Sequence, residues 1–137
     1  MLGEFFLGDD ELDPVLIAAG PSGRVPCVSA KGLTPVSVAS LAALLGVGSR
    51  EEVLVACGSR HHESESGESG VWDVPPAVAG ALRATEDLDP VAEQWVETEE
   101  LRRDGWQEPE AVAVLDQLAE LLTSQGPGQG LWYWWSL

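Results

Sequence analysis

Positive charge is scarce in this sequence. Its 137 residues include 7 Lys and Arg against 23 Asp and Glu, which gives a formal net charge of −16, and Lys31 is the only lysine. A strongly negative protein repels nucleic-acid phosphates and anionic lipid headgroups and attracts basic molecules. We therefore expect no direct binding to nucleic acid or to a membrane surface, and we expect any protein partner to be basic.

Cysteines and long apolar runs are scarce too. Cys27 and Cys57 are too few for a disulfide framework, so both are expected to be reduced. No run of about 18 apolar residues occurs, and the N-terminus lacks the basic start of a signal peptide, which predicts a cytoplasmic location. With 45% hydrophobic residues the chain can still form a core, and we predict a single domain over residues 1–137.

Motifs for catalysis or cofactor binding are missing. The sequence contains no G-x-S-x-G elbow and no glycine-rich loop that follows a predicted strand. His61 and His62 are adjacent, which makes it hard for both rings to reach one ion, and no third histidine exists to complete a metal site. Cys57, four residues before His61, is expected to pack in the core. We predict no metal and no cofactor, and we favour a protein without enzymatic activity over an enzyme.

The pattern of apolar and turn residues predicts an α+β fold, with a small mixed or antiparallel sheet packed against three to four helices. Capping residues and prolines predict helices over 35–45 and 90–101, a short helix from Pro75-Pro76, and a helix over 109–125. Apolar or β-branched runs predict strands over 24–30, 52–57 and 71–74, and the runs 4–7 and 15–19 are also candidate strands. Residues 58–70 are rich in glycine and serine and predict a flexible surface loop.

The C-terminal segment 131–137 contains four aromatic residues and predicts a strand with two apolar faces. Leu131, Tyr133 and Trp135 would face one way, and Trp132 and Trp134 the other. Such a strand left bare at a sheet edge would associate with other chains. It should therefore be central, covered or part of an interface, and a homodimer formed through it is one interpretation.

Acidic residues are concentrated between Glu86 and Glu100, where seven acids occur without a base. One interpretation is a solvated helical face. The other is a docking surface for a basic protein with a tryptophan as its aromatic anchor. The residues predicted for this surface are Glu93, Trp95, Glu97, Glu99, Glu100 and Trp106.

Lys31-Gly32-Leu33-Thr34-Pro35 offers a different kind of site. A lysine beside a helix N-terminus provides a positive charge, amide donors and the positive end of the helix dipole to an anion. Lys31, Gly32 and Thr34 are thus candidate anion-binding residues. The alternative is a simple turn that carries a surface lysine.

Four patches together resemble a group of small uncharacterised bacterial proteins. They are Lys31-Gly-Leu-Thr-Pro-Val36, Val74-Pro-Pro, Trp95-Val-Glu-Thr-Glu-Glu100 and Leu131-Trp-Tyr-Trp-Trp-Ser-Leu137. The order of elements over residues 25–137 is also distantly similar to the YfbM-like family of unknown function. That resemblance implies a compact α+β fold with helices against a small sheet, and it brings no catalytic residues.

Two functional hypotheses follow. The first is a cytoplasmic protein–protein interaction module that binds a basic partner through its acidic surface, in the manner of an immunity protein or other inhibitor. The second is a small-molecule anion-binding protein or enzyme that uses the turn from Lys31 to Pro35.

Overall fold

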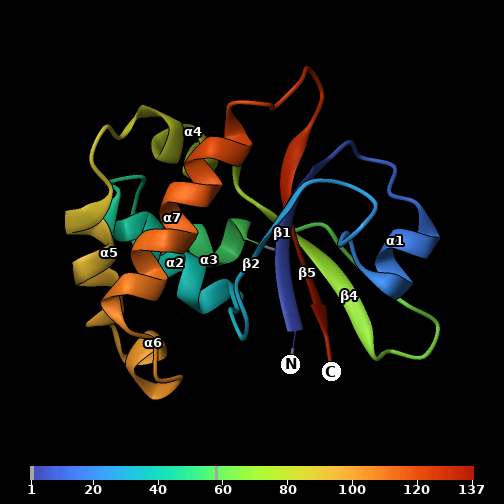
Figure 1. The fold of residues 1–137 in the computed structure, drawn as a ribbon, viewed down its shortest axis with the longest axis horizontal. Helices are drawn as coiled ribbons and strands as arrows, with labels where there is room; N and C mark the ends of the chain where they lie inside the picture. The colour runs from blue at the N-terminus through green and yellow to red at the C-terminus, as the bar shows by residue number, and fades with distance from the viewer. Residues whose placement is uncertain (1, 58) are drawn as a thin grey trace.

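A five-stranded antiparallel sheet runs through the protein, whose computed structural model describes residues 2–57 and 59–137 (Figure 1). The strand order is β2-β1-β5-β4-β3, and every neighbouring pair is antiparallel. The strands are β1 (Leu2–Gly8), β2 (Cys27–Ser29), β3 (His61–Glu63), β4 (Ser69–Val74) and β5 (Gly130–Ser136). This architecture confirms the predicted α+β class and the small antiparallel sheet.

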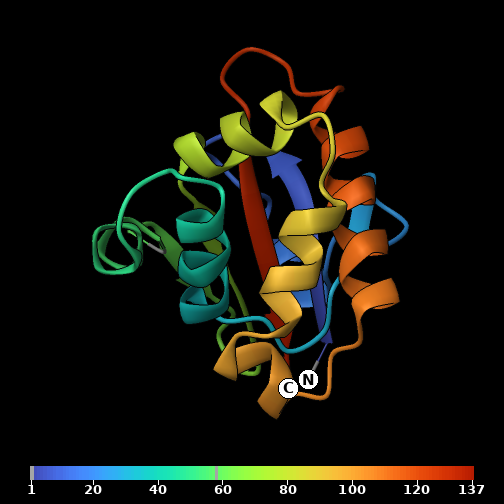
Figure 2. The ribbon, with the colours of Figure 1, turned by 90° about the vertical axis from the view of Figure 1, so that its left-hand side faces the viewer.

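Seven helices accompany the sheet in the described residues, rather than the three or four predicted. They are α1 (Pro14–Ala19), α2 (Pro35–Leu44), α3 (Arg50–Ala56), α4 (Pro76–Ala84), α5 (Asp89–Val96), α6 (Glu99–Arg103) and α7 (Glu108–Leu122). Figures 1 and 2 show α2 to α7 on one side of the sheet and α1 on the other, with the two chain ends close together at one end of the strands.

The aromatic C-terminal strand β5 lies at the centre of the sheet, between β1 and β4. Leu131 and Tyr133 belong to the large core beneath the helices, whereas Trp132 and Trp134 belong to a smaller core on the α1 side. The alternation predicted for this strand is therefore confirmed. Because both edges of β5 are already paired, the strand has no free edge through which a second chain could form a dimer.

Residues 15–19, a candidate strand in the sequence, form helix α1 instead. Asp13 accepts a hydrogen bond from Val15 N at 2.9 Å, and Pro14 occupies the first turn. This is the same combination of capping residue and proline that begins α2, but only five apolar residues follow it. Periodicity alone cannot separate a helix from a strand over so short a run.

The strand predicted over 52–57 is also wrong, because these residues form most of helix α3 and its C-cap. Ser49 Oγ accepts from Glu52 N at 3.2 Å, and Glu51 and Glu52 lie in the first turn, where the helix dipole favours negative charge. The apolar run that suggested an interior strand is only partly buried, since Val53 is 5% exposed but Val55 is 84% exposed.

The loop predicted over 58–70 contains a β-hairpin, although Gly58 lies outside the described residues. Strands β3 and β4 pair with His62 opposite Val71, and Ser64 N donates to Ser69 O to close the turn. Gly70 faces Trp135 so closely that a Cβ would lie 2.7 Å from its ring. The glycine that suggested flexibility is thus what allows an aromatic side chain to cross the strand.

The helix predicted over 90–101 is two helices. Helix α5 ends at Val96, and Thr98 then adopts an extended conformation as the residue before α6. The Thr98 hydroxyl donates to Trp95 O at 2.6 Å, which helps to close the end of α5. Arg102 and Arg103 lie in the last turn of α6, where positive charge complements the helix dipole as expected.

The remaining predicted helices are confirmed with small shifts of their ends. Helix α4 buries Val78 and Leu82, as the sequence indicated. Helix α7 spans Glu108–Leu122 and buries one apolar face against the sheet and α5.

An arginine fixes the start of the hairpin on the α1 side of the sheet. The buried Asp73 accepts hydrogen bonds from Arg60 N at 2.9 Å and from Arg60 Nε at 3.3 Å. The guanidinium also pairs with Asp10, and its carbon lies 4.9 Å from the ring centroid of Trp132. The guanidinium of Arg60 is therefore engaged in contacts within the protein, with Asp10, Asp73 and Trp132.

Candidate functional site

The turn from Ala30 to Leu33 is fixed to the sheet by one side chain. The hydroxyl of Tyr133, which is fully buried on β5, donates to Ala30 O at 2.6 Å and accepts from Leu33 N at 3.1 Å. The Tyr133 side chain crosses β1 at Gly3, where a Cβ would lie 1.7 Å from the hydroxyl oxygen. Lys31 and Gly32 are therefore presented from a rigidly held turn.

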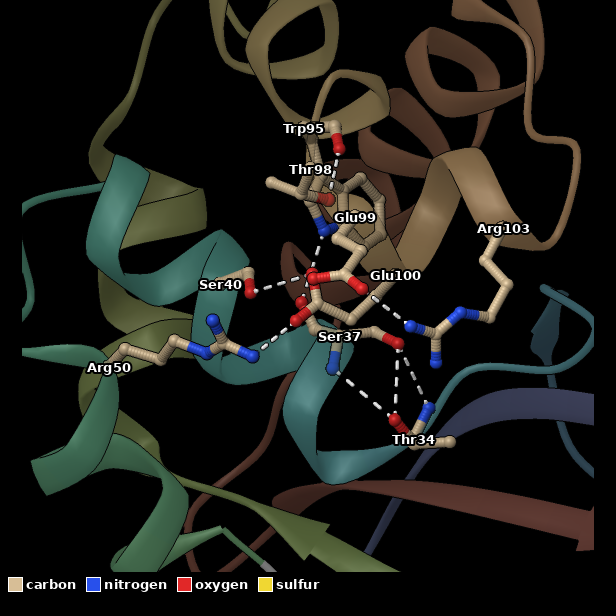
Figure 3. A network of polar contacts seen from close by, with 9 residues as sticks. All are labelled: Thr34, Ser37, Ser40, Arg50, Trp95, Thr98, Glu99, Glu100 and Arg103. Atoms are coloured by element: carbon tan, nitrogen blue, oxygen red, sulfur yellow. Dashed lines mark hydrogen bonds and ion pairs between the residues drawn. The ribbon is translucent and has the colours of Figure 1, made fainter.

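Three amide donors around the start of α2, those of Leu33, Thr34 and Ser37, are occupied by the protein itself. Thr34 Oγ1 accepts from Ser37 N at 3.4 Å, and Ser37 Oγ accepts from Thr34 N at 3.2 Å, a reciprocal capping box (Figure 3). Leu33 N is taken by Tyr133. The backbone N–H donors of Leu33, Thr34 and Ser37 are thus used internally, so the Thr34 amide is not available to an anion.

A surface cavity of about 650 Å³ lies beside Lys31. One wall is the turn after β2, and the other walls come from the α6–α7 connection and from the first part of α7. Its charged and aromatic lining residues are Lys31, Asp104, Trp106 and Glu110. Because two carboxylates face one ammonium group, the cavity carries a net negative charge, which disfavours an anion and favours a cation.

No local sequence pattern indicates that Asp104 and Glu110 line one cavity with Lys31. Glu110 is positioned by a capping box, in which its Oε1 accepts from Gln107 N at 3.2 Å. Asp104 lies at the C-cap of α6, directly over the turn, with its Oδ2 3.9 Å from the place of a Cβ on Gly32. The capping spacing could have placed Glu110 in a first helical turn, but only the tertiary fold brings both acids to residue 31.

Trp95, one of the two predicted aromatic anchors, belongs to the core. It is 0% exposed, and its indole Nε1 donates to Ser37 O at 3.1 Å, which ties α5 to α2. A side chain with no exposed surface cannot contact a partner. The assignment of Trp95 to a docking surface is therefore wrong.

Trp106, the other predicted anchor, is half-buried in the connection between α6 and α7. Its ring centroid lies 5.9 Å from that of Trp95, so the half-buried ring packs beside a fully buried one. Trp106 lines the cavity beside Lys31 and also a second hollow, which is lined by Glu97, Arg102 and Glu108. The indole thus lies between two groups of carboxylates.

Glu100 differs from the other predicted acids because it is held inside a network (Figure 3). Its side chain is 16% exposed, pairs with Arg50 and accepts from Ser40 Oγ at 3.4 Å. These contacts join α6 to α2 and to the start of α3. We assign Glu100 a structural role in place of the predicted contact with a partner.

Eight acids of the region from residue 86 to residue 110 are exposed and form no ion pair with another described residue. They are Glu86, Asp87, Asp89, Glu93, Glu97, Asp104, Glu108 and Glu110. Glu99 is exposed as well, and its pair with Arg103 on the same helix is worth only a few tenths of a kcal/mol, roughly 0.3–0.5. We call these nine residues, with Trp106, the acidic face.

Two members of the acidic face occupy positions where carboxylates are unfavourable. Glu97 and Asp104 are the C-cap residues of α5 and α6, at the negative ends of the helix dipoles. By contrast, Asp89 and Glu108 lie in first turns, where negative charge stabilises the helix. Helix capping thus accounts for part of the acidic face and leaves Glu97 and Asp104 without a stabilising role of this kind.

Neither cysteine has the environment of a nucleophile. Cys57 is buried on the helix side of the sheet, and burial together with the nearby negative charge of Asp73 raises its pKa to about 12.

His61 lies opposite Trp72 and His62 opposite Val71, so the two rings leave β3 on opposite faces. In the part of the chain that the structure describes, no group of three His, Cys, Asp or Glu residues could hold a metal ion.

We predict that neither thiol reacts appreciably at neutral pH. Partial burial, a hydrogen bond to Glu4 Oε2 at 2.8 Å and the charge of that carboxylate raise the pKa of Cys27 to about 11. The thiolate fraction near pH 8 should therefore be about a hundredfold below that of an ordinary thiol. The rate at which iodoacetamide alkylates the folded protein measures this thiolate fraction. In the C27S variant, Cys57 is the only thiol, so its rate is measured separately. Alkylation of Cys27 at the rate of a free thiol would contradict the assigned environment.

Comparison with protein families, with curated proteins and with solved structures finds no match to this chain. Among residues 2–57 and 59–137, none of the helices is both long and apolar enough to cross a membrane. The geometry of the site is therefore the basis for a proposed function.

Proposed function

We propose that this protein is a protein–protein interaction module that binds a basic partner through the acidic face, in the manner of an immunity protein or other inhibitor. The observation that carries the proposal is the position of Trp106, a half-buried aromatic side chain with carboxylates on both sides. Aromatic residues surrounded by a polar rim are typical of the residues that dominate binding energy at protein interfaces. The surrounding charge would also accelerate association with a basic protein.

We also propose that the interaction takes place in the cytoplasm. Both cysteines are free thiols, which is consistent with a reducing compartment. The distant resemblance to the YfbM-like family neither adds to this proposal nor opposes it, because it implies a fold and no activity.

Anion binding at the turn from Lys31 to Pro35 has less support. The amides of Leu33, Thr34 and Ser37 already donate to groups of the protein. Asp104 and Glu110 would repel an anion that entered the cavity beside Lys31. An enzyme that binds an anion here would need free amide donors at the turn and a cavity without the two carboxylates.

The proposal predicts that the location of the negative charge, and not its amount, determines partner binding. A variant with E93Q, E97Q and E108Q on the acidic face should lose at least tenfold in affinity for the partner. A variant with E51Q, E65Q and E68Q, which are exposed acids on α3 and in the β3–β4 turn, has the same net charge and should bind like the wild type. The measurement is affinity capture from a lysate of the source organism at moderate salt, followed by titration of the captured protein.

Two outcomes would contradict the proposal. One is that every captured protein binds the two triple variants with equal affinity, because such binding would depend on net charge alone. The other is that no basic protein is captured by the wild type at low or moderate salt, since an acidic docking surface requires one.

A further inference from the structure

We propose that the cavity beside Lys31 receives an arginine side chain of the basic partner. This inference rests on the proposed function and specifies its central contact. It combines a cavity, a pair of carboxylates and an aromatic ring that the fold brings together from the β2–α2 turn, the α6–α7 connection and α7.

The charge of the cavity suits a guanidinium group. Asp104 and Glu110 both line it, and a guanidinium can donate two parallel hydrogen bonds to a carboxylate. The capping box with Gln107 N orients the Glu110 side chain before any ligand arrives. Lys31 at the rim contributes the only positive charge among the lining residues, so a cation that enters still meets a net negative environment.

The apolar part of the cavity distinguishes it from the rest of the acidic face. Trp106, Ala113 and Val114 provide an aromatic ring and aliphatic surface next to the two carboxylates. A planar guanidinium stacks on an indole ring, and the methylene groups of the arginine would cover the aliphatic surface. Lysine offers the same charge without the planar fork, so it should bind less well.

The cavity is formed in advance of binding. Tyr133 fixes the wall from Ala30 to Leu33, and Trp95, fixed by its bond to Ser37 O, supports the ring of Trp106. Walls that are already ordered lose little conformational entropy when a ligand enters. The volume of about 650 Å³ is in the range of about 300–1,000 Å³ that is typical of small-ligand sites.

The test is an NMR titration of the ¹⁵N-labelled full chain with Nα-acetyl-arginine amide, with Nα-acetyl-lysine amide and spermidine titrated in parallel. A single residue should bind with a dissociation constant on the order of millimolar. We expect saturable shifts of the Trp106 indole N–H and of the Gly32 amide, at least threefold tighter for the arginine compound than for the other two. The W106A and D104N variants should each weaken this binding at least fivefold.

The E120Q variant is the matched control, because Glu120 is an exposed acid on the same helix as Glu110 and does not line the cavity. It should bind like the wild type. Non-saturable shifts spread over residues 86–110, equal for arginine and lysine, would overturn the cavity and leave the acidic face intact as a docking surface. Tighter saturable binding of spermidine at the same resonances would also overturn the proposal, because the cavity would then serve a free polyamine.

Discussion

The Tyr133→Phe variant is expected to be less stable than the wild type by about 2–4 kcal/mol, because each buried polar group left without a partner costs about 1–3 kcal/mol. The substitution removes one oxygen and keeps the ring, but it leaves both Ala30 O and Leu33 N without their hydrogen bonds. Urea denaturation followed by tryptophan fluorescence gives the free energy of unfolding.

The control for this variant is Ser136→Ala, which removes a solvent-exposed hydroxyl from the same strand. It should change the free energy of unfolding by less than about 0.5 kcal/mol. If Tyr133→Phe were equally mild, the turn that forms one wall of the cavity would not depend on the tyrosine hydroxyl.

The same tyrosine predicts a dependence of stability on pH. Burial raises the pKa of Tyr133 from 10.0 to about 12 in the folded protein. Between these values the unfolded chain loses the phenol proton while the folded chain retains it, so the wild type loses stability as the pH rises. The phenylalanine variant has no such proton. The difference in free energy of unfolding between the wild type and this variant should therefore narrow over this pH range.

The Trp95→Ala variant is expected to lose about 3–5 kcal/mol of stability, the usual cost of emptying the space of a buried tryptophan. Trp95 is 0% exposed, and the substitution also removes the hydrogen bond to Ser37 O that connects α5 with α2. Thermal and urea unfolding both measure the loss.

Trp106→Ala is the comparison that separates a core residue from a surface residue. Trp106 retains some exposed surface and has no counterpart to the hydrogen bond from Trp95 to Ser37 O, so its removal should destabilise the protein less than Trp95→Ala does. Equal losses for the two variants would contradict their assignment to core and surface. A large loss of partner binding by W106A with a small loss of stability is the pattern that an anchor requires.

The sequence predicted the parts of the fold whose signals are local and repeated. Helix α7 has apolar residues at regular helical spacing, and β5 alternates two apolar faces, so both were predictable from the pattern alone. Helices α1 and α3 were missed for a different reason. Their apolar runs are short, and the signals that favour a helix lie only at the N-terminal ends, in Asp13-Pro14 and in Ser49 with the acids that follow it.

The predicted site was corrected by burial and by contacts between distant segments. Trp95 and Trp106 both have acidic residues nearby in the sequence, and only packing decides that one is fully buried and the other half-buried. Nothing in the sequence distinguishes Glu100 from Glu97, and only the fold places Arg50, 50 residues earlier, beside Glu100. The presence of Lys31, Asp104 and Glu110 in one cavity likewise depends on how α7 packs against β2.

The most direct test of the acidic face is the affinity of a hexa-arginine peptide for Lys31→Met, measured by calorimetry at moderate salt. Removing the only positive charge from the cavity rim should tighten binding about two- to fivefold, a gain below about 1 kcal/mol as expected for one exposed charge. If the variant instead bound the peptide no better than the wild type while losing affinity for inorganic phosphate, the cavity would be an anion site. That result would contradict the binding of a basic side chain in the cavity, which is the central contact proposed for the docking surface.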